Sequence, residues 1–290
     1  MTKFSASEAA LEGFRLTRER PGTILGWGVV AAVCTFLIGQ ITLAILDPQL
    51  VALSRGGRLE PTDVEQVSEL LAQTSPAFVL VLVLITALIS KLMAGIYRLV
   101  LRPGEKGFLH LRFGKDELRL TGVNLLLFAI GMVLLTAEFA AVAAASQQGG
   151  IAYIAAGVLP IVGVWIGVRL SLATPMSFDQ HRFAIRDAWR ASRGKFWSLF
   201  GMIVLAVIFY VMVWLLISII GGVLLTLAGG AQAVQNPTSL SGAGLIIAAL
   251  YVFLQLVLTV IQLVMLYAPF AVAYQQLHGD PPANPLRARA

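Results

Sequence analysis

The sequence predicts an all-α fold, a polytopic transmembrane helical bundle with six spans. Apolar residues make up 58% of the 290 residues, whereas charged residues make up only 12%. Soluble domains carry about 25% charged residues, because a surface that faces water has to be largely polar. The apolar residues also lie in long uninterrupted stretches, which is typical of helices surrounded by lipid.

Six apolar stretches are long enough to cross a bilayer as helices. Even the shortest, 151–173, spans a hydrocarbon core about 30 Å thick at ~1.5 Å per residue. Helices are expected because lipid cannot satisfy unpaired backbone groups, and the alternating segments of about ten residues that form a membrane β-barrel are missing. The predicted spans are 23–46, 76–99, 121–145, 151–173, 198–228 and 245–273.

The chain divides into three predicted parts. Residues 1–22 form a cytoplasmic amphipathic segment, and residues 23–273 form the six-helix transmembrane domain. Residues 274–290, which contain several prolines, form a disordered cytoplasmic tail. The first apolar stretch is longer than the hydrophobic region of a signal peptide and lacks a small-residue cleavage site, so we expect an uncleaved anchor.

Lysine and arginine collect on one side of the predicted spans. The segment before the first span and the connections 100–120 and 174–197 hold most of them, whereas the other side holds only Arg55 and Arg58. Because basic connections stay in the cytoplasm, we expect a multi-pass protein of the cell inner membrane with both termini cytoplasmic. The same distribution accounts for the net charge of +6 without a nucleic-acid partner.

Short matching segments suggest an internal repeat. Residues 14–18 (Phe-Arg-Leu-Thr-Arg) and 189–193 (Trp-Arg-Ala-Ser-Arg) both precede a span, and residues 97–101 resemble residues 168–172 at span ends. They predict three two-span units, each preceded by an interfacial amphipathic helix, arranged as parallel repeats around an axis near the membrane normal. The alternative is that basic segments at helix starts resemble one another without any duplication.

Basic and aromatic residues beside the spans are candidates for binding lipid headgroups. Arginines recur at helical spacing in 182–197 beside an apolar stripe, a pattern that favours a helix lying at the headgroup level. Each cation near an anionic leaflet contributes about 1 kcal/mol. The alternative is that these residues only fix the topology. The predicted headgroup-binding residues are Arg15, Arg18, Arg98, Arg169, Trp189, Arg190 and Arg193.

Polar residues within the spans form a second set of candidates. Lys91 lies in the second span and Glu138 in the third, where an ionisable side chain is costly and indicates a functional site or a contact between helices. Their heights differ by ~13 Å at the rise of a helix, so direct pairing is not expected. Gln40 of the first span matches Glu138 in depth.

The last span carries a polar stripe. Gln255, Thr259 and Gln262 are spaced i, i+4 and i+7, which places them on one face of an otherwise apolar helix. Such a stripe has to face protein or water rather than lipid. It either joins neighbouring helices by hydrogen bonds or lines a cavity.

Catalytic and metal-binding patterns are missing from the sequence. His110, His181 and His278 are scattered without the spacing of metal ligands, and no GxSxG, P-loop or HExxH motif occurs. The single Cys34 excludes an intrachain disulfide. We therefore expect no enzymatic activity, no metal and no cofactor.

The segments 168–175 (Val-Arg-Leu-Ser-Leu-Ala-Thr-Pro) and 188–201, together with the basic segment 14–18, carry a family resemblance. The chain is similar to a bacterial six-span group that resembles the membrane domain preceding the catalytic domain in some glycerophosphodiester phosphodiesterases. The likeness covers most of the chain and concerns topology. Because the catalytic barrel of those enzymes is a separate soluble domain, the resemblance implies an association with lipid or envelope biology and not their activity.

Two functional hypotheses follow from these observations. The first is a non-enzymatic inner-membrane protein that organises lipid or a protein partner at the cytoplasmic face. Its expected partners are anionic membrane lipid, another protein, or a second copy of the chain in a homo-oligomer. The alternative is a small transporter or lipid-handling carrier that uses the polar stripe of the sixth span.

Overall fold

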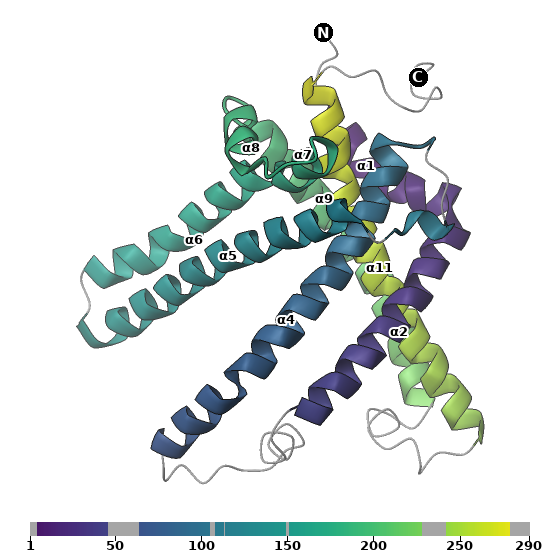
Figure 1. The fold of residues 1–290 in the computed structure, drawn as a ribbon, viewed down its shortest axis with the longest axis horizontal. Helices are drawn as coiled ribbons and strands as arrows, with labels where there is room; N and C mark the ends of the chain where they lie inside the picture. The colour runs from purple at the N-terminus through teal and green to yellow at the C-terminus, as the bar shows by residue number, and fades with distance from the viewer. Residues whose placement is uncertain are drawn as a thin grey trace.

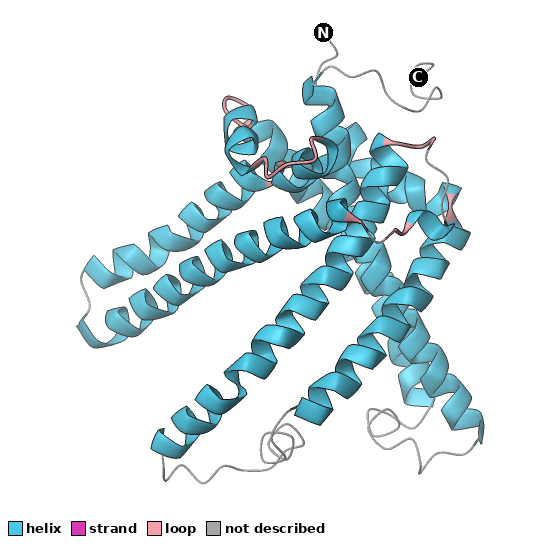
Figure 2. Ribbon diagram, in the orientation of Figure 1, coloured by secondary structure: helices cyan, strands magenta, loops and turns pink. Residues whose placement is uncertain are grey.

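The computed structural model describes residues 5–45, 64–104, 108–112, 114–148, 151–227 and 242–278, and in these ranges helix is the only regular secondary structure (Figure 2). Six of the helical segments are long and apolar enough to cross a membrane, which confirms the predicted fold class. The helices are α1 (Ala6–Glu19), α2 (Pro21–Ile45), α4 (Val64–Leu101), η1 (Phe108–His110), α5 (Lys115–Gln148), α6 (Ile151–Leu170), α7 (Ala173–Asp179), α8 (Ile185–Ala191), α9 (Phe196–Leu227) and α11 (Gly242–His278).

The helix bounds differ from the predicted ones at both ends of the bundle. The helix of the second span, α4, begins at Val64 rather than at residue 76. The helix of the fourth span, α6, ends at Leu170 rather than at residue 173, because a turn at Ser171 and Leu172 separates it from α7. The last helix continues to His278, beyond the predicted start of the tail at residue 274. Gln275 explains the extension, since its side-chain amide donates a hydrogen bond to the Val100 carbonyl at 3.1 Å and joins α11 to α4. Residues 279–290 of the predicted tail lie outside the described residues.

The spanning helices meet at one end and diverge toward the other (Figure 1). We call the meeting end the basic end, because it carries α1, α7, α8 and the arginines Arg98 and Arg169. The two ends of the described chain also meet there, since the Ser5 backbone N–H donates to Gln276 Oε1 at 3.1 Å. The chain therefore returns to the side on which it starts, as an even number of spans requires.

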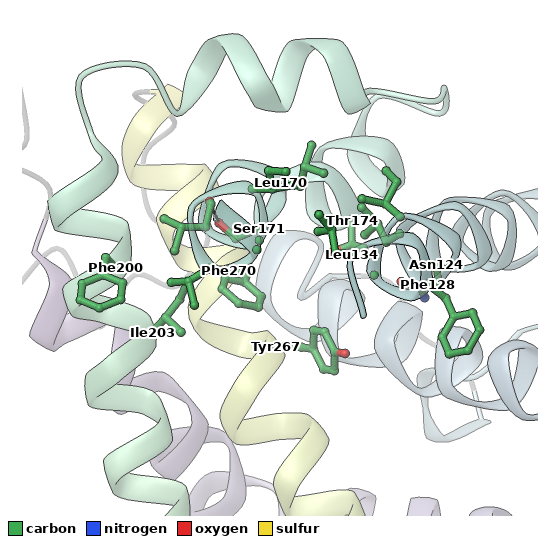
Figure 3. Close-up of a pocket in the computed structure, with 18 of the residues that line it drawn as sticks. Asn124, Phe128, Leu134, Leu170, Ser171, Thr174, Phe200, Ile203, Tyr267 and Phe270 are labelled. Atoms are coloured by element: carbon green, nitrogen blue, oxygen red, sulfur yellow. Dashed lines mark hydrogen bonds between the residues drawn. The ribbon is translucent and has the colours of Figure 1, made fainter. Parts of the chain in front are cut away.

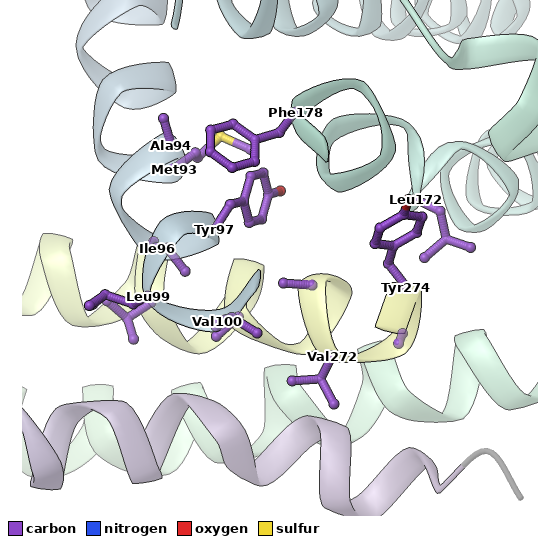
Figure 4. Packing of buried hydrophobic residues seen from close by; sticks show 14 of the residues in the cluster. Met93, Ala94, Ile96, Tyr97, Leu99, Val100, Leu172, Phe178, Val272 and Tyr274 are labelled. Atoms are coloured by element: carbon purple, nitrogen blue, oxygen red, sulfur yellow. The ribbon is translucent and has the colours of Figure 1, made fainter. Parts of the chain in front are cut away.

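The buried core lies at the basic end (Figure 4). Tyr97 and Phe178 are almost fully buried, with ring centroids 5.8 Å apart, and the Tyr97 hydroxyl is hydrogen-bonded to Thr174 Oγ1 at 2.7 Å. Along the spans, by contrast, large apolar side chains such as Phe139 and Ile246 are more than two-thirds exposed. Lipid has to cover these faces, because in water a large apolar area would remain in contact with solvent.

Consecutive spans pack as three hairpins, α2 with α4, α5 with α6, and α9 with α11. The second helix of each hairpin contacts the first helix of the next, through the pairs α4–α5 and α6–α9, and α11 closes the series on α2. The short elements follow the same cycle. Each lies against the preceding hairpin, η1 on α2 and α4, α8 on α6, and α1 on α9 and α11.

Polar side chains at the hairpin ends make equivalent contacts in this cycle. Arg98 donates to the His110 carbonyl of η1 at 3.0 Å, and Arg169 donates to Ser192 Oγ at the end of α8 at 3.4 Å. Gln276 at the end of α11 accepts from Ser5 at the start of α1. This arrangement fits the three two-span units suggested by the sequence, while the duplication itself stays a prediction.

The contact between α1 and α11 depends on one small residue. Gly13 is buried against Met265, and a Cβ atom at this position would lie 2.6 Å from Met265 Cα. The backbone of α11 cannot move away cheaply, because α11 also packs on α2, α4 and α9. The absence of a side chain at residue 13 therefore allows the last hairpin to hold the first helix.

We predict that Gly13→Ala lowers the free energy of unfolding by about 1–3 kcal/mol, as overpacking of a tight contact does. Thermal unfolding of the detergent-purified protein measures the effect. Gly22→Ala is the matched control, because a Cβ atom there meets nothing within 4 Å. Equal unfolding midpoints for the two variants would contradict the close approach of α1 and α11.

Candidate functional site

Arg98 and Glu117 form a buried ion pair at the basic end. Arg98, at the end of α4, is 4% exposed, and its guanidinium bonds to the Glu117 carboxylate at the start of α5. The same guanidinium lies 5.5 Å from the centroid of the Phe178 ring. We therefore correct the headgroup-binding role predicted for Arg98, because burial within the protein keeps this side chain away from lipid.

A second network crosses four helices beside this pair. Arg102 donates to the Asp179 carbonyl and contacts His181 Nε2, both at 3.2 Å. Asp179 also accepts from the Tyr274 hydroxyl at 2.8 Å, and His181 Nδ1 lies 2.7 Å from Asp116 Oδ1. The network joins α4, α5, α7 and α11, so its groups hold the helices together. The sequence contains only a weak sign of it, the spacing of Asp179 and His181.

Arg169 lies between two tryptophans. Its guanidinium carbon is 5.4 Å from the centroid of Trp165 and 4.8 Å from that of Trp189, and the two rings meet edge to face. Cation–π contacts of this kind are worth about 0.5–2 kcal/mol each. The structure thus brings together Arg169 and Trp189, two of the predicted residues, and adds Trp165, which the sequence analysis missed. The cluster fixes α8 against α6.

The remaining predicted arginines differ in exposure. Arg15 is held by Glu12 at 3.0 Å and by Glu19 at 3.5 Å, whereas Arg18 is exposed. Arg182 pairs with Asp187 of α8 at 2.7 Å, whereas four other exposed cations around α8 form no ion pair among the described residues. Beside them, Trp197 is 78% exposed at the start of α9. We call this surface the α8 edge, and it consists of Arg186, Arg190, Arg193, Lys195 and Trp197.

The polar residues within the spans do not gather at one site. Gln40 is exposed on α2, while Glu138 is half-buried on α5, and no hydrogen bond joins them among the described residues. On α11, Tyr251 and Gln255 face Gly221 of α9, where a Cβ atom would lie 3.3 Å from the Tyr251 ring.

The hydroxyl of Thr259 donates to the Gln255 carbonyl of its own helix at 3.0 Å, and Gln262 is half-buried. Neither they nor Gln255 line the two cavities described below. This geometry favours helix packing over a cavity for the polar stripe.

A cavity of about 660 Å³ lies where the three hairpins meet, and we call it the junction cavity. Its wall is largely apolar, and the polar side chains in it are Thr86, Asn124, Ser171, Thr174 and Tyr267, the last four of which are labelled in Figure 3. No charged residue is among its lining residues. Its volume falls within the range of small-molecule sites, about 300–1,000 Å³.

A second cavity, of about 700 Å³, lies between α2, α4 and the start of α5. We call it the lysine cavity, because both Lys91 and Lys115 line it, together with Glu117. Its remaining wall is almost entirely apolar and includes Leu37 and Leu84. Lys91, a candidate from the sequence, thus lines this cavity.

Comparisons with protein-family models, curated proteins and solved structures found no match to this chain. The resemblance to the membrane domain of glycerophosphodiester phosphodiesterases therefore stays a prediction. Among the described residues, no group of three or more His, Cys, Asp or Glu side chains is arranged to hold a metal ion. The candidate site consists of the α8 edge and the two cavities.

We predict that Glu117→Gln lowers the free energy of unfolding by about 3–5 kcal/mol, because it leaves Arg98 buried without its counter-charge. Replacing both partners, as Arg98→Met with Glu117→Leu, should recover most of this loss. The exposed pair Arg182–Asp187, 2.7 Å apart, supplies the control. Arg182→Gln should change stability by about 0–1 kcal/mol. A Glu117→Gln protein as stable as that control would refute the buried pair.

Proposed function

We propose that the protein binds and organises anionic lipid at the cytoplasmic face of the inner membrane, without enzymatic activity. The observation that carries the proposal is the α8 edge, where four exposed cations lie beside an exposed tryptophan. Each cation near an anionic leaflet contributes about 1 kcal/mol of attraction. Arginine also adds specificity for phosphate, because its planar guanidinium group can donate two parallel hydrogen bonds to phosphate oxygens.

The α8 edge is suited to the boundary between hydrocarbon and headgroups. Trp197 is the second residue of α9, whose apolar segment Phe196–Leu227 begins there, and aromatic rings at span ends favour that boundary. The Arg169 cluster holds α8 at the end of α6. The backbone of α8 is therefore held in place, so headgroup binding has to order only the side chains of its cations.

The orientation of the basic end supports the cytoplasmic assignment. Exposed Arg18 and the α8 edge all lie at the end where the described chain begins and finishes. Basic residues beside spans are retained in the cytoplasm, which supports an inner-membrane protein with both termini on that side. The uncharged junction cavity leaves lipid handling as a second candidate function, based on that cavity and not on the polar stripe.

We predict that Arg190→Gln with Arg193→Gln weakens phosphatidylglycerol binding about 10- to 30-fold, because two cations of about 1 kcal/mol each are lost. Native mass spectrometry of the detergent-purified protein, titrated with this lipid, measures the affinity. The control is the charge-preserving pair Arg190→Lys and Arg193→Lys, and binding of phosphatidylcholine should be equal in all variants.

Two outcomes would overturn the proposal. If the glutamine variant binds phosphatidylglycerol with unchanged affinity, the α8 edge does not bind this lipid. A normal lipid affinity accompanied by loss of a dimer or of a co-purifying acidic protein would assign the edge to a protein partner or to a second copy.

A further inference from the structure

We propose that the junction cavity binds one uncharged lipid that carries a free hydroxyl group, with an apolar chain of this lipid between the α5–α6 hairpin and α11. The inference deepens the second candidate function, lipid handling at this cavity, and rests on it. It is independent of the function proposed for the α8 edge, because the two sites share no residue.

The size of the junction cavity calls for an occupant. Protein interiors leave few voids larger than a water molecule, whereas this cavity measures about 660 Å³. Water is a poor occupant, because apolar walls offer it few hydrogen-bond partners. An empty space would leave the wall atoms without dispersion contacts on one side. In a membrane, the apolar chain of a lipid fills such a space.

Three glycines keep the junction cavity open. Gly131 on α5 and Gly163 and Gly167 on α6 line it, and a Cβ atom at any of them would meet nothing within 4 Å. Glycines in membrane helices commonly allow two helices to approach closely, but no neighbour comes that close to these three. Glycine also weakens a helix relative to alanine, so neither packing nor helix stability explains them. Their common effect is to widen the cavity.

The wall of the junction cavity reaches the lipid-facing surface. Phe128 on α5 and Val164 on α6 both line the cavity and are 44% and 52% exposed. The α5–α6 hairpin also diverges from α4 away from the basic end (Figure 1). In the membrane these exposed faces touch acyl chains. A lipid can therefore enter the cavity sideways from the bilayer, without crossing water.

The charge of the cavity wall favours an uncharged ligand. No charged residue is among the described residues that line it. A phosphate or carboxylate group there would lack a counter-charge in a region of low dielectric constant, which is costly. The ligand still needs a polar group, because the hydroxyl of Tyr267 in the cavity wall forms no hydrogen bond within the ranges that the structure describes (Figure 3).

Asn124 adds a free acceptor to the same wall. Its side-chain amide nitrogen donates to Ser90 Oγ at 2.8 Å, and the Ser90 hydroxyl in turn donates to the Thr86 carbonyl at 2.7 Å. Ser90 can therefore only accept from Asn124, which fixes the orientation of the amide. The Asn124 carbonyl oxygen is left without a hydrogen bond among the described residues. A hydroxyl group on the ligand can accept from Tyr267 or donate to Asn124, whereas an ester carbonyl can only accept.

Photo-crosslinking tests the inference. The full-length protein is placed in phosphatidylcholine nanodiscs with a monoacylglycerol whose chain carries a diazirine, and crosslinked peptides are identified by mass spectrometry. We expect crosslinks to the residues of α5, α6 and α11 that line the cavity. Unlabelled monoacylglycerol and an isoprenoid alcohol should both compete, and the stronger of them identifies the class of lipid. The methyl ester of the same fatty acid, which lacks a hydroxyl group, and lysophosphatidylglycerol should compete several-fold more weakly.

A cavity-filling variant locates the bound chain. Gly163→Leu should lower the crosslinking yield several-fold, because its side chain occupies the space that the lipid needs. Gly201→Leu on α9 is the matched control, since a Cβ atom there also meets nothing within 4 Å and residue 201 lines neither cavity. Thermal unfolding midpoints of both variants show that they are folded.

A second variant tests the hydroxyl group of the wall. Tyr267→Phe should weaken the competition by unlabelled monoacylglycerol about 2- to 10-fold, as expected for the loss of one hydrogen bond. Tyr153→Phe, at an exposed position outside the cavity, should leave it unchanged. The variant with Arg190→Gln and Arg193→Gln should also bind normally, so that failure of the α8-edge proposal and failure of this one are distinguishable.

Four results would overturn the inference. Equal competition by the methyl ester would show that any acyl chain fills the cavity, and equal competition by lysophosphatidylglycerol would show that the site does not exclude charge. An unchanged yield in folded Gly163→Leu protein would place the lipid outside the cavity. Unchanged competition in Tyr267→Phe protein would show that this hydroxyl does not bind the ligand.

Discussion

The large exposed apolar area of the spanning helices has to be covered by lipid, and this constraint determines where the chain can place polar groups. Phe139 and Ile246 show it on two different hairpins, with more than two-thirds of each side chain exposed. Because lipid cannot hydrogen-bond, charged and polar side chains are satisfied mainly at the basic end. There Arg98 is neutralised by Glu117, and Arg102 joins α4 to α7.

The same constraint concentrates charged groups at the basic end. Cations that are not needed for packing remain exposed on the α8 edge, and Lys91 and Lys115 line a cavity whose deeper wall is apolar. We propose the first of these features, the α8 edge, as a surface for anionic lipid. The cyclic packing of the hairpins connects this edge to the cavity, since each short element rests on the preceding hairpin.

The sequence was sufficient to predict the six spans, because length and apolar composition alone decide whether a helix can cross a bilayer. It also named Arg169 and Trp189 as headgroup-binding candidates, and the structure places these two residues in contact. It could not distinguish buried Arg98 from exposed Arg190, since an arginine beside a span looks the same whether a carboxylate or a headgroup faces it. The surroundings of Lys91 depend on packing between α2, α4 and α5, which no periodicity reveals.

The central claim is that lipid surrounds six spans and that the basic end faces the cytoplasm. Reporters whose signal depends on the compartment, fused in turn at Met1 and at Ala290, test it most directly in intact cells. We expect a fluorescent protein that folds only in the cytoplasm to give signal at both ends, and a phosphatase active only outside to give none. Signals from opposite faces, or phosphatase activity at both ends, would contradict the account.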